Sequence, residues 1–322
     1  MLVQSPQGPL FGIHASAALV LSLHVRGLRR VSERLPQRLP QRVQVSIYRS
    51  LINREVILPK KKTGPRFTAR NSDRHDLYQR SVQAPEFEVE FFDKTFKKLR
   101  KRKPLSMRED FCGTALLCAH WADSHKKRTA LGVDLDPEVL AWGIENNLAP
   151  LGAAIERVDL ARRDVRQVTQ GKFDLVNAMN FSYWILQQRR EMLRYFRSVR
   201  KSLVADGVFF LDMYGGWESQ EIMAEKRKID GGFTYVWDQH SFNPMTNEAV
   251  NYIHFRFKDG SALERAFKYT WRCWSMVEIR ELLHEAGFKK LHIYWDVADG
   301  SFRERKKMHN QPGWLAYIAA LV

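Results

Sequence analysis

Residues 105–115 read LSMREDFCGTA, and residues 131–137 read LGVDLDP. The first segment begins as an extended run that ends in Glu109 and Asp110, and the second is an apolar run that ends in Asp134. A short helical pattern lies between them. The sequence therefore predicts a strand, a tight turn through Gly113, a short helix over 115–124 and a second strand that ends at Asp134.

This order of elements is typical of nucleotide-binding α/β sheets. A glycine in the turn lets the backbone approach a ligand closely, and the N-terminus of the following helix offers free N–H groups. An acid about 20 residues after the glycine commonly accepts from ribose hydroxyls, and Asp134 lies twenty-one residues after Gly113 (134 minus 113). Short glycine motifs are weak signals, so an ordinary βαβ unit without a ligand remains the alternative.

The segment resembles the first motif of the class I S-adenosylmethionine (SAM) methyltransferases, which reads acid-x-Gly-x-Gly-x-Gly. Glu109 matches the acid, and Phe111, Gly113 and Ala115 occupy the glycine positions, so only the central glycine is kept. The resemblance covers roughly residues 73–322. It implies SAM as cofactor and a Rossmann-like, doubly wound, mixed seven-stranded α/β sheet with an antiparallel C-terminal hairpin and a β-rich cap insertion.

The resemblance also assigns residues to the cofactor. Asp134 would hold the ribose, Asp164 and Val165 the adenine, and the turn from Glu109 to Thr114 the methionine portion; Asp159 competes with Asp164. The full set of expected cofactor-binding residues is Glu109, Cys112, Gly113, Thr114, Asp134, Leu135, Asp164, Val165 and Asn180.

A buried-strand pattern over 173–179 leads into Asn180-Phe181-Ser182-Tyr183-Trp184, where donor and acceptor are expected to meet, because ligands of open α/β sheets bind beyond the carboxyl ends of the strands. The segment lacks the prolines of methyltransferases that act on exocyclic or amide nitrogens, and the cysteine of those that make 5-methylcytosine. It resembles small-molecule O- or N-methyltransferases. The expected acceptor-binding residues are Tyr78, Tyr183, Trp184 and Tyr214, with core packing as the alternative for each.

The remaining patterns divide residues 71–322 into four parts. A helical lid is expected over 71–104, the SAM-binding core over 105–216, an antiparallel cap insertion over 217–273, and a C-terminal helix and hairpin over 274–322. Further expected elements are helices over 73–82, 85–99, 136–148, 188–204 and 275–287, a helical piece over 217–228, and strands over 155–160, 208–214, 233–239, 249–258, 263–272, 288–295 and 314–322.

The net charge of +16 is unevenly distributed. Residues 1–70 hold thirteen Lys and Arg against two acids, which leaves a surplus of only five for the rest of the chain. The first 70 residues are therefore interpreted as a disordered or targeting-like basic extension. Nucleic-acid binding by the folded part is not favoured. A cytoplasmic location is expected, with organelle import through the extension as the alternative.

Three cysteines without metal-ligand spacing predict neither a metal site nor a disulfide framework. No apolar run reaches the ~18 residues that a membrane-spanning helix needs. The sequence predicts an enzyme that methylates a small molecule, without metal. A nucleic-acid or protein methyltransferase, and a SAM-binding protein without activity, remain as alternatives.

Overall fold

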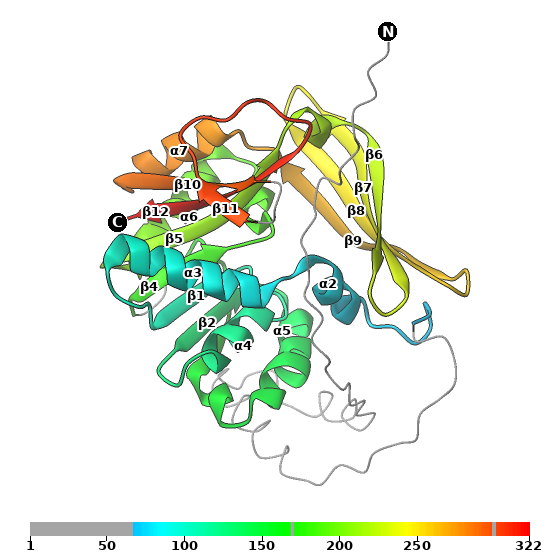
Figure 1. Ribbon diagram of the computed structural model, residues 1–322, viewed down its shortest axis with the longest axis horizontal. Coiled ribbons are helices and arrows are strands. Elements are labelled where there is room, and N and C mark those ends of the chain that lie inside the picture. Colours follow the sequence, from blue (N-terminus) through cyan, green and yellow to red (C-terminus); the bar gives the residue numbers. More distant parts are fainter. Residues whose placement is uncertain (1–66, 169–170, 298–300) are drawn as a thin grey trace. The chain divides into compact units, whose positions relative to one another are not determined.

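The computed structural model describes residues 67–168, 171–297 and 301–322, which belong to one compact unit. The disordered or targeting-like extension was expected over residues 1–70, of which 1–66 lie outside the described residues. Residues 67–70 are described, and Phe67 is buried and packs on Phe233, so the folded part begins slightly earlier than expected. Figure 1 shows one large sheet flanked by helices and a second, smaller sheet. Within the described ranges, no helix is both long enough and apolar enough to cross a membrane.

The large sheet has the strand order β11-β10-β12-β5-β4-β1-β2-β3. The five strands from β5 to β3 run parallel to one another. Strand β12 pairs antiparallel with both β5 and β10, and β11 pairs antiparallel with β10. All seven expected strands are present, and the short β11 adds an eighth at the edge of β10. The bounds are β1 Ser106–Asp110, β2 Thr129–Asp134, β3 Val158–Arg162, β4 Phe173–Ala178, β5 Leu203–Gly215, β10 Lys290–Val297, β11 Ser301–Glu304 and β12 Trp314–Leu321.

Helices cover both faces of this sheet. Successive side chains of β5 point to opposite faces and so contact helices on each side. Phe210 lies 4.7 Å, between ring centroids, from Phe92 of α3, and its neighbour Phe209 lies 5.8 Å from Phe196 of α6. The helices are α2 Arg74–Val82, α3 Pro85–Arg100, α4 Leu116–Asp123, α5 Pro137–Gly143, α6 Arg189–Ser202 and α7 Met276–Glu285.

The expected helix caps are present. Asp136 accepts from the first-turn N–H groups of α5, and Ser275 and Glu278 form the capping box of α7. The strand expected over 155–160 begins later than predicted, because a π-helical turn and a 3-10 segment carry the chain from α5 to Arg157. This strand, β3, therefore begins at Val158.

The second sheet is antiparallel, with the order β6-β7-β8-β9. The helical piece expected over 217–228 is wrong: only Trp217–Gln220 is helical, as a 3-10 turn, and β6 follows. Exposure along β6 alternates with a period of two, because pairing with β7 outweighs the helix propensity of its Glu and Lys residues. The bounds are β6 Met223–Ile229, β7 Phe233–Asn243, β8 Glu248–Phe257 and β9 Ala262–Arg272.

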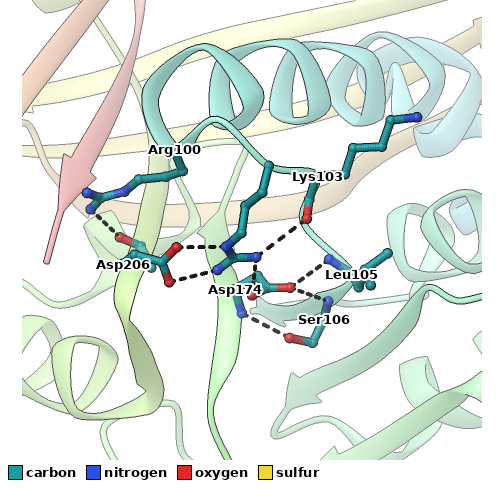
Figure 2. Close-up of polar contacts among 8 residues, drawn as sticks. Arg100, Lys103, Leu105, Ser106, Asp174 and Asp206 are labelled. Carbon is teal, nitrogen blue, oxygen red and sulfur yellow. Dashed lines mark hydrogen bonds and ion pairs between the residues drawn. The ribbon is translucent and has the colours of Figure 1, made fainter.

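The basic run at the end of α3 anchors that helix to the sheet. Arg102 makes ion pairs with Asp174 at 2.8 Å and Asp206 at 2.7 Å, and Arg100 donates to the carbonyl of Gly207 at 3.0 Å (Figure 2). Asp174 also accepts the backbone N–H of Ser106 at 3.1 Å. These contacts join α3 to β1, β4 and β5 and occupy the two arginines within the fold.

Candidate functional site

The turn between β1 and α4 has an unusual backbone. Gly113 has φ +51°, and the residues at the two other expected glycine positions, Phe111 and Ala115, have φ +57° and +54°. This left-handed region is easy for glycine and costs other residues ~1–2 kcal/mol. The turn therefore has left-handed backbone at all three expected glycine positions, although only Gly113 is a glycine.

This turn is joined directly to the acid that ends β2. The backbone N–H of Gly113 donates to the Asp134 carboxylate at 2.9 Å, and the N–H of Asp136 donates to its other oxygen at 3.0 Å. Each carboxylate oxygen keeps acceptor capacity for a further donor. Leu135 follows and is 60% exposed, so it offers an apolar surface beside the acid.

Two of the expected cofactor residues lie beneath the turn. Glu109 is buried and accepts from the backbone N–H of Cys118 at 3.1 Å and from its thiol at 2.9 Å, which ties β1 to α4. Burial raises the pKa of Glu109 to about 8. The Cys112 side chain is also buried and packs under β2, where a Cβ on Gly132 would lie 2.8 Å from its sulfur. Both side chains support the turn from inside the core.

Thr114 connects the turn to its neighbours. Its hydroxyl accepts from the Gln79 side chain of α2 at 2.7 Å, and its carbonyl accepts from the Asn147 side chain at 2.8 Å. Helix α5 packs so closely here that a Cβ on Gly143 would lie 2.4 Å from the Thr114 carbonyl oxygen. The turn is therefore held from both sides.

The expected adenine residues follow β3. The Asp164 carboxylate binds the Arg166 guanidinium at 2.6 Å, and this hydrogen bond lowers the pKa of Asp164. Val165 is buried. The competing acid, Asp159, is exposed and pairs with Leu131 inside the strand, away from its carboxyl end.

Sequence reasoning missed Arg108, which fixes the Val165 loop. Its guanidinium is fully buried and donates to Asp110 at 2.6 Å, to the Ser202 hydroxyl at 2.8 Å and to the Val165 carbonyl at 3.0 Å. A cation inside a buried strand pattern was the available signal, since such a charge requires partners.

The loop after β4 is held by another missed residue, Asp212 of β5. Its carboxylate accepts the backbone N–H of Asn180 at 2.8 Å and that of Phe181 at 2.9 Å. These two residues have φ +56° and +57°, so the carboxylate stabilises a strained turn. Asp212 is only 4% exposed, and burial raises its pKa to about 7.

Asn180, Phe181 and Asp212 line a cavity of about 660 Å³. The wall comes from α2, α3, the ends of β4, β5 and β12, and the insertion strands β6 and β7. The lining residues are Ser81, Val82, Glu88, Asn180, Phe181, Asp212, Tyr214, Glu225, Lys226, Arg227, Lys228, Tyr235, Trp237, Leu315 and Tyr317.

Glu88 of α3 was also missed. It is 6% exposed, and its carboxyl has no hydrogen bond or ion pair within the described ranges. Burial, with the nearby charges of Asp212 and Glu109, raises its pKa to about 8. The signal was its place in the sequence, since Glu88 precedes Phe91 and Phe92 by three and four residues and so lies on the apolar face of the helix.

Of the expected acceptor residues, Tyr214 lines the cavity and the other three do not. Tyr183 is buried and donates its hydroxyl to the Asp212 carbonyl at 2.8 Å, and Trp184 stacks on Tyr214 at 4.8 Å. Tyr78 packs instead on Phe267 of the insertion, with ring centroids 5.1 Å apart. Tyr183 and Trp184 therefore form a layer behind the cavity wall.

No group of three or more His, Cys, Asp or Glu residues in the described part of the chain has an arrangement that could hold a metal ion.

Comparisons with known proteins agree with this architecture. No family model matches the chain. YqeM of Bacillus subtilis (strain 168), named as a candidate methyltransferase, is 22% identical over 193 residues, covering 58% of this chain and 75% of that protein.

Solved structures show the same fold. A SAM-dependent methyltransferase from Clostridium acetobutylicum ATCC 824 gives a TM-score of 0.58 at 19% identity, covering 76% of this chain and 96% of the other. The amino pentose methyltransferase CalS10 from Micromonospora echinaspora gives 0.56 at 14% identity, covering 81% and 99%. The chain therefore has the fold of SAM-dependent methyltransferases and is distantly similar in sequence to a protein named as a methyltransferase.

Proposed function

We propose that this chain transfers a methyl group from SAM to a small molecule bound in the 660 Å³ cavity. The observation that carries the proposal is the placement of two sites at the carboxyl edge of one sheet. The bonded pair of Gly113 and Asp134 follows β1 and β2, and the cavity lies beyond β4 and β5. Helix α2 spans both sites, since Gln79 bonds Thr114 and Ser81 lines the cavity.

The donor side fits the cofactor. The Asp134 carboxylate has spare acceptor capacity for a ribose diol, and the left-handed turn brings backbone close to the ligand. The exposed Leu135 would lie against the nucleoside, and Asp164 and Val165 would meet the adenine, with Arg108 holding their loop. SAM supplies an activated methyl group on a sulfonium. The protein's share of catalysis is then to hold donor and acceptor in line at about 3–3.5 Å without intervening water.

The acceptor side has the size of a small-molecule site. Ligand pockets are typically about 300–1,000 Å³ and mostly apolar with a few polar groups, and this cavity matches that description. CalS10 and KedS8 from Streptoalloteichus, which share the fold, are named as an amino pentose methyltransferase and a sugar N-methyltransferase. In the Lys97–Lys103 run, Arg100 and Arg102 are bonded within the fold, so the run gives little support to a nucleic-acid acceptor.

Calorimetry with SAM, S-adenosylhomocysteine (SAH) and NAD tests the cofactor. We expect heat of binding with SAM and SAH and none with NAD; binding of NAD alone would contradict the proposal. Incubation with methyl-labelled SAM and a fractionated metabolite extract then tests the acceptor. We expect label in a small-molecule fraction, whereas label in RNA or protein alone would contradict the acceptor class, and SAM binding without any transfer would indicate an inactive cofactor-binding protein.

A further inference from the structure

The cavity combines two features that bear on what it can bind. One is aromatic surface, supplied by Phe181, Tyr214, Tyr235, Trp237 and Tyr317. The other is a pair of buried carboxyls, Glu88 and Asp212, which come from helix α3 and strand β5.

Burial of a carboxyl without a partner is unfavourable. Glu88 is 94% buried (100 minus 6), with no hydrogen bond or ion pair among the residues of known placement. The Asp212 carboxylate accepts the backbone N–H groups of Asn180 and Phe181, one on each oxygen, and each oxygen of a carboxylate can accept more than one hydrogen bond. The Glu88 and Asp212 carboxyls therefore present free hydrogen-bond acceptor sites to a ligand in the cavity.

From this arrangement we infer that the acceptor is an amine on an apolar or aromatic frame, with its nitrogen held by the Glu88 and Asp212 carboxyls. The inference rests on the proposed function and specifies its substrate class. An ammonium group offers up to three N–H donors, so it can bond both carboxyls at once. A hydroxyl offers one donor and no charge, so it can donate to only one of the two carboxyls and forms no ion pair with either. The surrounding aromatic faces also attract a cation.

The same arrangement supplies the proton transfer that an amine requires before it can attack. The ammonium gives one proton to the Glu88 carboxylate and becomes a neutral amine with a free electron pair. That pair forms the new N–C bond to the sulfonium methyl group of SAM, while the S–C bond breaks and its electrons remain on sulfur. The products are the methylated ammonium, SAH and a protonated Glu88, whose proton then passes to solvent.

The electrostatics of Glu88 suit this role. Burial raises its pKa to about 8, so the Glu88 carboxylate is a stronger base toward an ammonium group than an ordinary carboxylate is. The charged and titratable groups around it, from every element that lines the cavity or shifts its pKa, are Glu86 of α3, Glu109 of β1, Asp212 and Tyr214 of β5, Glu225, Lys226, Arg227 and Lys228 of β6, Tyr235 of β7 and Tyr317 of β12. Two of these groups, Glu109 and Asp212, are buried acids whose negative charges raise the pKa of Glu88, and the same charges attract a cationic ligand.

Two probes that differ only in their polar group test the inference. Binding of 2-phenylethylamine and of 2-phenylethanol is measured by calorimetry on the full chain saturated with SAH. The variants are Glu88→Gln, which keeps the shape of the side chain, and Glu90→Gln as control. Glu90 lies on the same helix, is exposed and pairs with Lys94.

We expect the amine to bind about 10-fold tighter than the alcohol, as a charge-assisted hydrogen bond allows. Glu88→Gln should abolish this preference with SAH binding unchanged, and Glu90→Gln should keep it. SAH binding without an amine preference, or with neither probe bound, would overturn the inference and leave the proposed function standing. A preference that survives in Glu88→Gln would overturn the role of Glu88. Failure to bind SAH would overturn the proposed function and the inference with it.

Discussion

The backbone N–H of Gly113 donates to the Asp134 carboxylate at 2.9 Å, so a direct hydrogen bond joins the turn after β1 to the acid that ends β2. The two residues are twenty-one positions apart and come from adjacent parallel strands. A binding site assembled in advance loses less conformational entropy on binding than one that must order itself.

Asp134→Ala should weaken SAM and SAH binding strongly. The substitution removes both the proposed acceptor for the ribose and the bond that fixes Gly113. A hydrogen bond to a charged group is worth ~1.5–3 kcal/mol, about 10- to 150-fold. Calorimetry measures the loss. Asp134→Asn keeps an oxygen that can accept from Gly113 and should lose less. Equal affinity of wild type and Asp134→Ala would show that this carboxylate does not hold the cofactor.

Asp164→Ala should weaken SAH binding, and Asp159→Ala should not. Asp164 follows the carboxyl end of β3, where the adenine is expected, whereas Asp159 lies within the strand and faces solvent. We expect about a 10-fold loss for the first variant, the size of one hydrogen bond of ~1.4 kcal/mol. The reverse order of the two effects would place the adenine elsewhere.

Arg108→Ala should destabilise the fold by about 3–5 kcal/mol, because it leaves the buried Asp110 carboxylate without its cation. The Val165 loop also loses its donor, so SAH affinity should fall. Denaturant unfolding measures the first effect. Arg189→Ala is the matched control: its ion pair with Glu285 is exposed and should contribute under about 1 kcal/mol. Similar losses in both variants would contradict the expected role of burial.

Gly143→Ala should destabilise the protein by about 1–3 kcal/mol, because its added methyl group would lie 2.4 Å from the Thr114 carbonyl oxygen. The shifted turn should also bind SAH more weakly. Ala141→Ser, at an exposed position of the same helix, is the control and should change stability by less than about 0.5 kcal/mol. An unfolding midpoint and SAH affinity equal to those of wild type would show that the helix and turn are less tightly packed.

The buried carboxyls predict how stability changes with pH. Burial raises the pKa of Glu88 and Glu109 to about 8 and that of Asp212 to about 7, so the folded state binds more protons than the unfolded chain above about pH 4.5. The free energy of unfolding should therefore fall as pH rises from about 4.5 to about 8.

Glu88→Gln removes the contribution of Glu88 to this pH-dependent decrease in the free energy of unfolding. The variant should be more stable than wild type at pH 8.5, by up to about 5 kcal/mol, and should show a smaller difference at pH 5. Denaturant unfolding at the two pH values measures this. If Glu88→Gln were instead less stable than wild type, and by more at pH 8.5 than at pH 5, the result would show that Glu88 is stabilised in its charged form.

Local sequence was sufficient for much of the architecture. Asp136 and the pair of Ser275 and Glu278 mark helix starts because a cap needs only a few consecutive residues. The insertion strand β6 escaped prediction, since its Glu and Lys residues favour a helix and only pairing with β7 makes it a strand.

The sequence by itself determined the run of strand, turn, helix and strand that ends at Asp134, because hydrophobic periodicity and turn chemistry act over a few neighbouring residues. Tertiary structure decided the cavity chemistry. Glu88 and Asp212 are 124 positions apart (212 minus 88), and only the packing of α3 beside β5 brings both carboxyls to one cavity. Which buried charges share a site depends on contacts between distant segments, and no local pattern records those contacts.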